Sequence, residues 1–286
     1  MPSATSRKST AAAVTATASP IITLLTDFGS RDAYAAIMKG VMLGLAPQAR
    51  IVDLCHEVTP YQIPEAGFIL CQSYRYFPKG SIHVVVVDPG VGSERRAIAV
   101  EAFGHRFIGP DNGVFSMLLR EAAFDSGGKR LCRVREITNR KLGLPSPGNT
   151  FHGRDIFAPA AAHLATGVKF SALGPLIEDA LRQDWDLPIR TGKRFWQGAV
   201  FKEDRFGNLI TNFRAADFPL ASGSFELQAG LESIRTVHPH FAAATGGELF
   251  LFAGSSGFWE IARNQASAAK MLGLAGGSPL ELAILR

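Results

Sequence analysis

Two aspartates stand directly after apolar segments that are short enough to be buried strands. Asp27 lies in the segment Thr26–Gly29, and Asp88 opens the loop Asp88–Arg96. Ligands of parallel α/β sheets bind beyond the carboxyl ends of the strands, so both carboxylates are placed to contact one. A carboxylate at Asp27 can accept two hydrogen bonds from a vicinal diol such as ribose. The alternative role is a cap on the following helix, for which Asp32 lies closer to the helix start.

Arg95 and His152 add a fixed charge and a titratable ring to this set. Gly90 and Gly92 allow a tight loop across which Arg95 can fold back towards Asp88. His152 lies in a loop before an apolar helix, and histidine is the side chain whose ordinary pKa is near neutrality. From these residues alone, a catalytic set and a structural Asp–Arg pair that closes a turn are equally supported.

Two more polar clusters occupy the C-terminal third, at Glu203–Asn208 and Gly254–Asn264. The first combines carboxylates with an amide, and the second combines two hydroxyls on a glycine-flanked turn with Arg263. Both compositions are also typical of hairpin turns. The residues themselves leave ligand contact and turn formation open.

The elements that must position these residues alternate between strands and helices. Apolar runs predict strands at 21–25, 51–54, 82–87, 97–102 and 106–109. Apolar residues at helical spacing predict helices at 32–45, 64–77, 114–123 and 157–165. In the first helix the expected apolar face is Tyr34, Ile37, Met38, Val41 and Leu45. This alternation predicts an α/β fold with a largely parallel sheet, in which the fully apolar strand 82–87 is central.

The pattern changes after Gly174-Pro175, where short strand-like segments separated by turns follow. Such spacing predicts a smaller all-β domain. We therefore expect a disordered tail at 1–19, an α/β domain including a linker at 20–189, and the β domain at 190–286. The tail is rich in Ala, Ser and Thr without acidic residues, a composition that an organelle transit peptide shares.

Composition excludes several classes of function. The net charge of +5 is spread along the chain without interleaved aromatic residues, so no nucleic-acid partner is expected. No apolar run approaches the roughly 18–20 residues that cross a bilayer, so we expect no membrane span. The three cysteines lack close pairing, which argues against disulfides and a zinc site and favours the reducing cytoplasm.

Seven segments occur together in the order found in one known family. They are TDFG at Thr26–Gly29, DLCHEVTPY at Asp53–Tyr61, VVVDPGVGSERR at Val85–Arg96, GPDNG at Gly109–Gly113, TFHGRDIFAP at Thr150–Pro159, RFGNLITN at Arg205–Asn212 and SSGFWEIARN at Ser255–Asn264. In this set the chain resembles the S-adenosyl-L-methionine (SAM) hydroxide adenosyltransferases, relatives of the bacterial fluorinase and chlorinase. The resemblance covers roughly residues 20–285.

The resemblance implies an α/β domain followed by a β barrel-like domain, in a homotrimer. It implies that SAM binds between the N-terminal domain of one subunit and the C-terminal domain of its neighbour. The water-activating set of the family falls on Asp88, Arg95 and His152. The implied substrate contacts are Asp27 for the ribose, Tyr61 and Phe151 around the substrate, Asn208 and Arg263 for the adenine, Ser255 at the methionine end, and Asp204, in competition with Glu203, for the amino group.

Departures from the halogenating branch favour water as the nucleophile. The fluorinase has Tyr at the position of Asp88 and a Tyr-Ser pair at His152-Gly153, so the serine that holds fluoride is absent. Val91 replaces the threonine of the halide pocket. Ser256 replaces an arginine that binds the methionine carboxylate in the fluorinase, which leaves the binding of that group open.

The sequence therefore predicts hydrolysis of SAM to adenosine and L-methionine without a metal or cofactor. Water attacks the ribose 5′ carbon, and the sulfonium is already a good leaving group. Arg95 favours hydroxide, while Asp88 or His152 takes the proton. The alternatives are a SAM-dependent halogenase, a non-catalytic adenosine-binding protein and a metal-dependent hydrolase. The last would place Arg95 beside the cation that it would repel.

Overall fold

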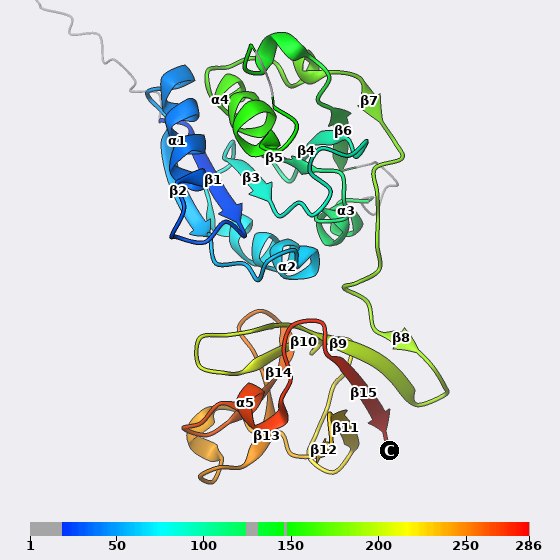
Figure 1. Ribbon diagram of the computed structural model, residues 1–286. Coiled ribbons are helices and arrows are strands. Elements are labelled where there is room, and N and C mark those ends of the chain that lie inside the picture. The colour runs from blue at the N-terminus through cyan, green and yellow to red at the C-terminus, as the bar shows by residue number, and fades with distance from the viewer. Residues whose placement is uncertain (1–18, 124–130, 146–147, 286) are drawn as a thin grey trace, which may run out of the picture.

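The computed structural model describes residues 19–123, 131–145 and 148–285, which form two parts (Figure 1). The first part is a mixed sheet with helices on both faces, and the second is an antiparallel, barrel-like sheet. The predicted α/β class is confirmed. The predicted tail lies outside the described residues except for Ser19. No helix in the described ranges is long and apolar enough to cross a bilayer.

The first sheet has the strand order β2-β1-β3-β5-β4-β6-β7. Its strands are β1 Ile21–Thr26, β2 Arg50–Cys55, β3 Ile82–Val86, β4 Ala97–Ala102, β5 His105–Pro110, β6 Cys132–Glu136 and β7 Leu176–Ile177. The neighbours from β2 to β5 are parallel, whereas β4, β6 and β7 add antiparallel pairs. The expectation of a largely parallel sheet therefore holds for only half of it. Phe103 and Gly104 have φ angles of 53° and 78°, as a tight hairpin turn requires, so β4 and β5 form a hairpin instead of a crossover.

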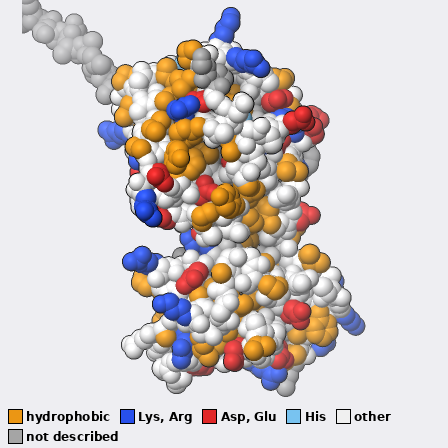
Figure 2. Space-filling view, viewed as in Figure 1, with side chains coloured by type: hydrophobic (Ala, Val, Ile, Leu, Met, Phe, Trp, Pro, Cys, Tyr) orange, Lys and Arg blue, Asp and Glu red, His pale blue; other side chains and the backbone are white. Residues whose placement is uncertain are grey.

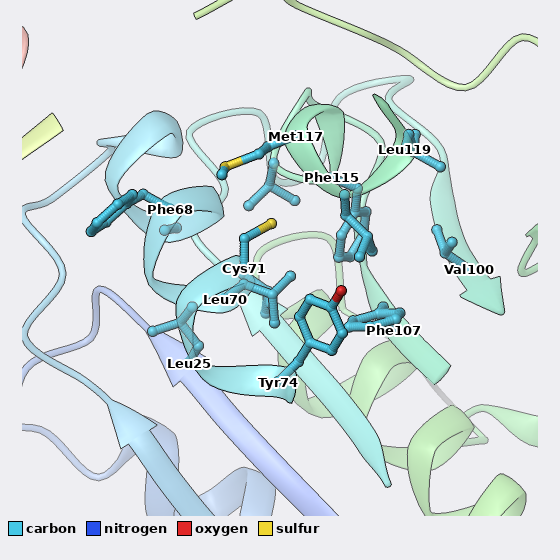
Figure 3. Packing of buried hydrophobic residues seen from close by; sticks show 14 of the residues in the cluster. Leu25, Phe68, Leu70, Cys71, Tyr74, Val100, Phe107, Phe115, Met117 and Leu119 are labelled. Carbon is cyan, nitrogen blue, oxygen red and sulfur yellow. The ribbon is translucent and has the colours of Figure 1, made fainter. Parts of the chain in front are cut away.

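Helices cover both faces of this sheet. They are α1 Tyr34–Leu45, α2 Ile63–Ser73, α3 Ser116–Glu121 and α4 Ala158–Ala165, with 3-10 turns at Tyr74–Tyr76, Arg140–Leu142 and Phe170–Leu173 and a π-helix at Gly153–Phe157. Residues of α1 and α4 share one buried cluster, and residues of α2 and α3 share the other. Figure 3 shows side chains of α2 and α3 converging over the sheet on the second face. Each fully buried leucine, phenylalanine or methionine side chain in these clusters contributes about 1.5–3 kcal/mol to the free energy of unfolding.

The buried face of α1 differs from the predicted one. Ala35, Met38 and Met42 are buried, whereas Tyr34 and Ile37 are 48% and 42% exposed. The helix carries two overlapping apolar stripes, one beginning at Tyr34 and one at Ala35. The stripe that begins with the smaller Ala35 is the one that packs against the alanine-rich helix α4. Of the predicted face, Met38 is buried and Val41 packs partly against the same cluster, whereas Tyr34, Ile37 and Leu45 remain exposed.

The second part is an eight-stranded antiparallel sheet with the order β12-β11-β15-β9-β10-β14-β13, in which β8 also pairs with β9. Its elements are β8 Ile189–Arg190, β9 Phe195–Glu203, β10 Leu209–Arg214, β11 Phe225–Ala229, β12 Glu232–Ile234, a 3-10 turn Phe241–Ala243, β13 Leu249–Ala253, β14 Phe258–Arg263, α5 Ala268–Leu272 and β15 Pro279–Ile284. Val237, which follows β12, bridges to Leu251 of β13, so the sheet nearly closes on itself. The barrel-like form implied by the family resemblance is confirmed.

Aromatic packing joins the two parts. Phe68 of α2 stacks on Phe201 of β9 at 5.0 Å and meets Phe258 of β14 edge-on at 5.7 Å. Beside them, Lys202 Nζ lies 3.5 Å from Glu65 Oε1. One buried cluster therefore spans both parts, which fixes how the barrel sits below α2.

The strand order creates one natural ligand position in the first part. The chain runs from β1 to β2 on one side and then returns past β1 to form β3 on the other side, so β1 lies between them. Crevices at such reversals, beyond the carboxyl ends of the strands, are where open α/β sheets bind ligands. Thr26 and Val86 are paired at this edge, and Asp27 and Asp88 follow them.

A buried histidine pair lies at the other end of the same strands. His83 Nδ1 is 2.8 Å from Thr23 Oγ1, and His83 Nε2 is 3.2 Å from His105 Nδ1. Burial lowers the pKa of His83 to about 3, with a further contribution from His105. Burial also lowers the pKa of His105 from its ordinary value.

We expect acid to destabilise the fold through this pair. As the pH falls below the ordinary histidine pKa of 6.5, the unfolded chain binds protons that the folded protein does not. The free energy of unfolding should then fall by about 1.4 kcal/mol per pH unit for each such proton. Urea denaturation between pH 7.5 and 5 measures how the free energy of unfolding depends on pH. This dependence should be shallower in the His83→Leu variant. Equal slopes in the two proteins would contradict this assignment.

Candidate active site

A cavity of about 570 Å³ opens at the carboxyl ends of β1 and β3. Five of the predicted site residues line it: Asp27, Tyr61, Asp88, Phe151 and His152. The volume lies within the roughly 300–1,000 Å³ range of small-molecule sites. The sheet reversal thus brings together residues from loops that are distant in sequence.

Arg95 connects two of these residues from behind the cavity wall. Its Nε lies 3.0 and 2.9 Å from the two carboxylate oxygens of Asp88, and one terminal nitrogen also contacts that carboxylate. The same terminal nitrogen lies 2.8 Å from His152 Nδ1. The side chains of Asp88 and Arg95 are only 4% and 9% exposed. The three predicted residues therefore form one continuous, largely buried hydrogen-bonded chain.

This geometry fixes the tautomer of His152. A guanidinium can only donate hydrogen bonds, so Nδ1 must accept and the ring proton must be on Nε2. Burial and the charge of Arg95 both lower the pKa of His152 from its ordinary value, which keeps the ring neutral near pH 7. His152 therefore offers an N–H donor, and its basic lone pair is occupied by Arg95.

The backbone around His152 is unusual. The residue directly precedes the π-helix Gly153–Phe157, which continues into α4. Single π-turns of this kind are frequent at functional sites. The Arg95 guanidinium lies over the Phe157 ring, 5.3 Å from its centre. The π-turn thus directly follows the residue that carries the imidazole and supplies the apolar surface beneath the arginine.

The segment Gly109–Gly113 braces the loop of Asp88. Asp111, which is buried, accepts a hydrogen bond of 2.9 Å from Arg96 Nε, and Asn112 Nδ2 donates to the carbonyl of Val87 at 2.9 Å. These two residues do not line the cavity. They hold the two ends of the loop that carries Asp88.

Asp27 is held by the neighbouring loop. Its Oδ2 accepts the backbone N–H of Tyr61 at 2.9 Å. The N-cap position of α1 is Ala33 and no side chain caps the helix, so the capping alternative was wrong for both Asp27 and Asp32. Burial raises the pKa of Asp27, and the charge of Asp88 adds to this, while the Tyr61 N–H opposes it.

Aromatic residues that the sequence did not single out complete this wall. Phe28 and Tyr34 both line the cavity. Their rings lie 5.9 and 5.3 Å from that of Phe151, and 5.5 Å from each other. In the sequence, the sign that could have identified Phe28 as a cavity residue is its position directly after Asp27.

The residues assigned to adenine lie in a different cavity. Asn208 and Arg263 line a cavity of about 500 Å³ on the barrel, together with Phe206 and Phe241. Arg263 Nε donates to the carbonyl of Gly247 at 2.8 Å. Phe206 is 79% exposed, and an exposed aromatic residue in a turn was the signal that could have identified it.

Asp204 and Ser255 line neither cavity. Asp204 Oδ1 accepts the N–H groups of Phe206 and Asn208 at 2.8 and 2.9 Å, and Oδ2 accepts Asn208 Nδ2 at 2.8 Å. Its carboxylate therefore shapes the hairpin between β9 and β10 and fixes the Asn208 amide. Ser255 is exposed on the turn between β13 and β14, so both C-terminal clusters do form hairpin turns.

No group of three or more His, Cys, Asp or Glu in the described ranges is arranged to hold a metal ion. The first cavity offers the hydrogen-bonded chain of Asp88, Arg95 and His152. A carboxylate, a guanidinium and a neutral imidazole there can orient and polarise one small nucleophile.

Two family models match the chain. The SAM hydroxide adenosyltransferase N-terminal domain matches residues 22–174, and the C-terminal domain of the same family matches 198–281. The chain belongs to the SAM hydroxide adenosyltransferase family. The match places the first cavity in the N-terminal family domain and the second in the C-terminal one.

Within this family, relatives named (R)-S-adenosyl-L-methionine hydrolase match almost end to end. The protein of Thermus thermophilus is 37% identical over 262 residues, covering 90% of this chain and 97% of its own, and that of Salinispora tropica is 36% identical, covering 92% and 97%. A fluorinase of an Actinoplanes species matches at 27% identity. An uncharacterised conserved protein of Thermotoga maritima has a TM-score of 0.80 at 32% identity, covering 92% and 99%.

Gly92 gives a test of how the Asp88 loop is seated. It has a φ of 81°, and a Cβ there would lie 2.6 Å from the carbonyl oxygen of Asn149. We expect Gly92→Ala to push the segment before His152 away and to lower kcat/KM for SAM at least tenfold. Gly80→Ala is the matched control, because Gly80 has a φ of 88° but open space around it. Similar losses of activity in both variants would contradict the seating role.

Proposed function

We propose that this protein hydrolyses S-adenosyl-L-methionine to adenosine and L-methionine. The observation that carries the proposal is the chain Asp88–Arg95–His152 at the switch-point cavity. The hydrolase relatives at 36–37% identity support the substrate. Within the cavity, Val91 offers an apolar side chain and no hydroxyl for a halide ion, which favours water as the nucleophile.

The reaction is one substitution at carbon. The oxygen of water bonds to the ribose 5′ carbon, and the bond from that carbon to sulfur breaks. Sulfur takes the electron pair and becomes the neutral thioether of methionine, so the leaving group needs no acid. One proton per turnover is released from the attacking water and passes to solvent.

The geometry favours Asp88 as the residue that takes this proton. The His152 Nδ1 lone pair is occupied by Arg95, so His152 orients the water through its Nε2–H. Asp88 Oδ2 accepts hydrogen bonds from two nitrogens of Arg95, whereas Oδ1 accepts only one and retains a second lone pair. The guanidinium stabilises the negative charge that develops on the attacking oxygen. Orientation of water and carbon at about 3–3.5 Å supplies much of the remaining acceleration.

The other predicted residues contact the substrate in this proposal. Asp27 accepts both ribose hydroxyls, with Tyr61 and Phe151 against the sugar and base. Asn208 and Arg263 contact the adenine. The methionine end is received at the two hairpin turns by Asp204 and Ser255, for which Asp204 must exchange some of its turn contacts. The reaction as written requires no metal or cofactor.

The active assembly is proposed to be a homotrimer with sites between subunits. The residues proposed for the ribose and those proposed for the adenine line separate cavities of one chain, which supports a site shared between subunits. Figure 2 shows hydrophobic side chains on the face that carries α1, where Tyr34, Ile37 and Leu45 are exposed. Exposed apolar surface of this kind marks contact with other proteins.

A cytoplasmic location fits the cysteines. Cys55 and Cys71 carry free thiols, and burial raises the pKa of the Cys71 thiol, which keeps it protonated and unreactive. Such thiols persist in a reducing compartment.

Asp88→Asn tests the proposed base. The amide preserves the shape but cannot take a proton, so we expect kcat to fall at least a hundredfold with KM within about threefold. His152→Ala should lose about tenfold or more, because water remains but is less well oriented. The rate of adenosine and methionine formation, followed by mass spectrometry at several SAM concentrations, measures these losses in both variants. Unchanged adenosine production by both variants would refute the assignment.

Isotope-labelled water tests the nucleophile. We expect the label in the 5′ hydroxyl of adenosine and none in methionine. Incubation with chloride or fluoride should give no 5′-halo-adenosine. A halogenated product would support the halogenase alternative, and bound adenosine without methionine release would support a binding protein.

Active-site complementation tests the shared site. We expect Asp88→Ala and Arg263→Ala proteins, each inactive, to regain activity after subunit exchange. About a quarter of the sites in an equal random mixture then combine two intact halves. Mixtures of two Asp88 variants are the control and should stay inactive. No recovery in exchanged mixtures would place both halves of the site in one subunit.

A further inference from the structure

A chain of four side chains runs from the surface to the turn that holds Asp27. Lys39 Nζ lies 2.6 Å from Asp53 Oδ2, and Asp53 Oδ1 lies 3.0 Å from His56 Nε2. His56 Nδ1 lies 2.8 Å from Thr26 Oγ1. From Asp53 inwards the exposure of the side chains falls, from 42% for Asp53 to 14% for His56, and Thr26 is fully buried.

The direction of every hydrogen bond in this chain can be assigned. Burial opposes ionisation of Asp53, but the hydrogen bonds from Lys39 and His56 hold its pKa below the ordinary value. His56 Nε2 lies 3.0 Å from Asp53 Oδ1, and a carboxylate oxygen would repel a lone pair at that distance, so Nε2 carries the ring proton. Thr26 Oγ1 accepts the backbone N–H of Phe28 at 3.3 Å, and with the ring proton on Nε2 the Thr26 hydroxyl donates to His56 Nδ1.

An Asp–His–Thr series could activate a nucleophile, but this one cannot. Thr26 has no exposed surface, so no substrate atom can reach its oxygen. That oxygen also already accepts from the backbone of Phe28. The series therefore acts on the conformation of the chain, at the residue directly before Asp27.

His56 also joins two loops of the cavity wall. Its carbonyl accepts the N–H of Gly29 at 2.7 Å, while its ring holds Thr26. Further along the same loop, the N–H of Tyr61 donates to Asp27 Oδ2 at 2.9 Å. The turn containing Asp27 is thus fixed on both sides of the aspartate by the loop that follows β2.

We propose that His56 is a positioning residue which, through Thr26, aims the Asp27 carboxylate at the two hydroxyls of the bound ribose. This inference rests on the proposed hydrolysis of SAM, in which Asp27 holds the ribose. Lys39 and Asp53 fix the position and tautomer of the His56 ring. The contact between that ring and Thr26 then fixes the turn that carries Asp27. Because Asp27 binds the ribose equally before and during attack, its misplacement weakens substrate binding more than the chemical step.

Thr26→Val removes the hydroxyl without changing the size of the side chain. Loss of one net hydrogen bond at the ribose should raise KM for SAM about fivefold, with kcat within twofold. Thr26→Ser keeps the hydroxyl and should restore the KM of the unaltered protein. Thr23→Val is the matched control, because Thr23 lies on the same strand and makes the same 2.8 Å contact to the Nδ1 of a histidine, His83. It should lower stability and leave KM unchanged.

A double-mutant cycle separates positioning from general loosening. In an Asp27→Ala background, Thr26→Val should change KM no further, since the chain acts only through Asp27. Asp53→Asn breaks the chain at its exposed end and provides a second variant if the buried ones fold poorly. It should also raise KM.

Two failures of these measurements are distinguishable. No adenosine from the unaltered protein would overturn the proposed function. An active protein in which Thr26→Val and Thr23→Val have the same KM, or in which Thr26→Val still raises KM in the Asp27→Ala background, would overturn only the positioning role.

Discussion

The guanidinium of Arg95, held between Asp88 and His152, is the interaction on which the site depends. It neutralises a buried carboxylate that would otherwise be costly to ionise, and it occupies one nitrogen of the imidazole. A single cation therefore pairs with the carboxylate of one neighbour and sets the tautomer of the other. Removing it would leave Asp88 without its charged partner and His152 free to take either tautomer.

Much of the first part serves to keep that arrangement in place. Asp111 and Asn112 tie down both ends of the Asp88 loop, and Phe157 supports the arginine from below. On the other side of the cavity, His56 and Tyr61 fasten the turn of Asp27. Residues in two of the seven family-like segments, Asp53–Tyr61 and Gly109–Gly113, therefore hold the backbone of the loops that carry Asp27 and Asp88.

The sequence predicted the parts of this architecture that local rules determine. Asp27 and Asp88 could be placed at the sheet edge because each follows a buried strand, and the glycines of the loop allowed Arg95 to reach back. The contact between Arg95 and His152 could not be derived, since it depends on how α4 packs on β3, and only the family resemblance indicated it. The β4–β5 hairpin was not predicted and the buried stripe of α1 was predicted only in part, because two positive φ angles and the choice of packing partner leave little trace in apolar periodicity.

The π-turn after His152 has a geometric consequence for the whole site. A π-turn holds one more residue than the same stretch of α-helix, and each residue of an α-helix advances the chain by about 100° around the axis. Without the extra residue, α4 could keep its packing while His152 pointed to a different side of the helix, away from Arg95. The site thus depends on a one-residue phase shift in a helix whose buried face gives no sign of it.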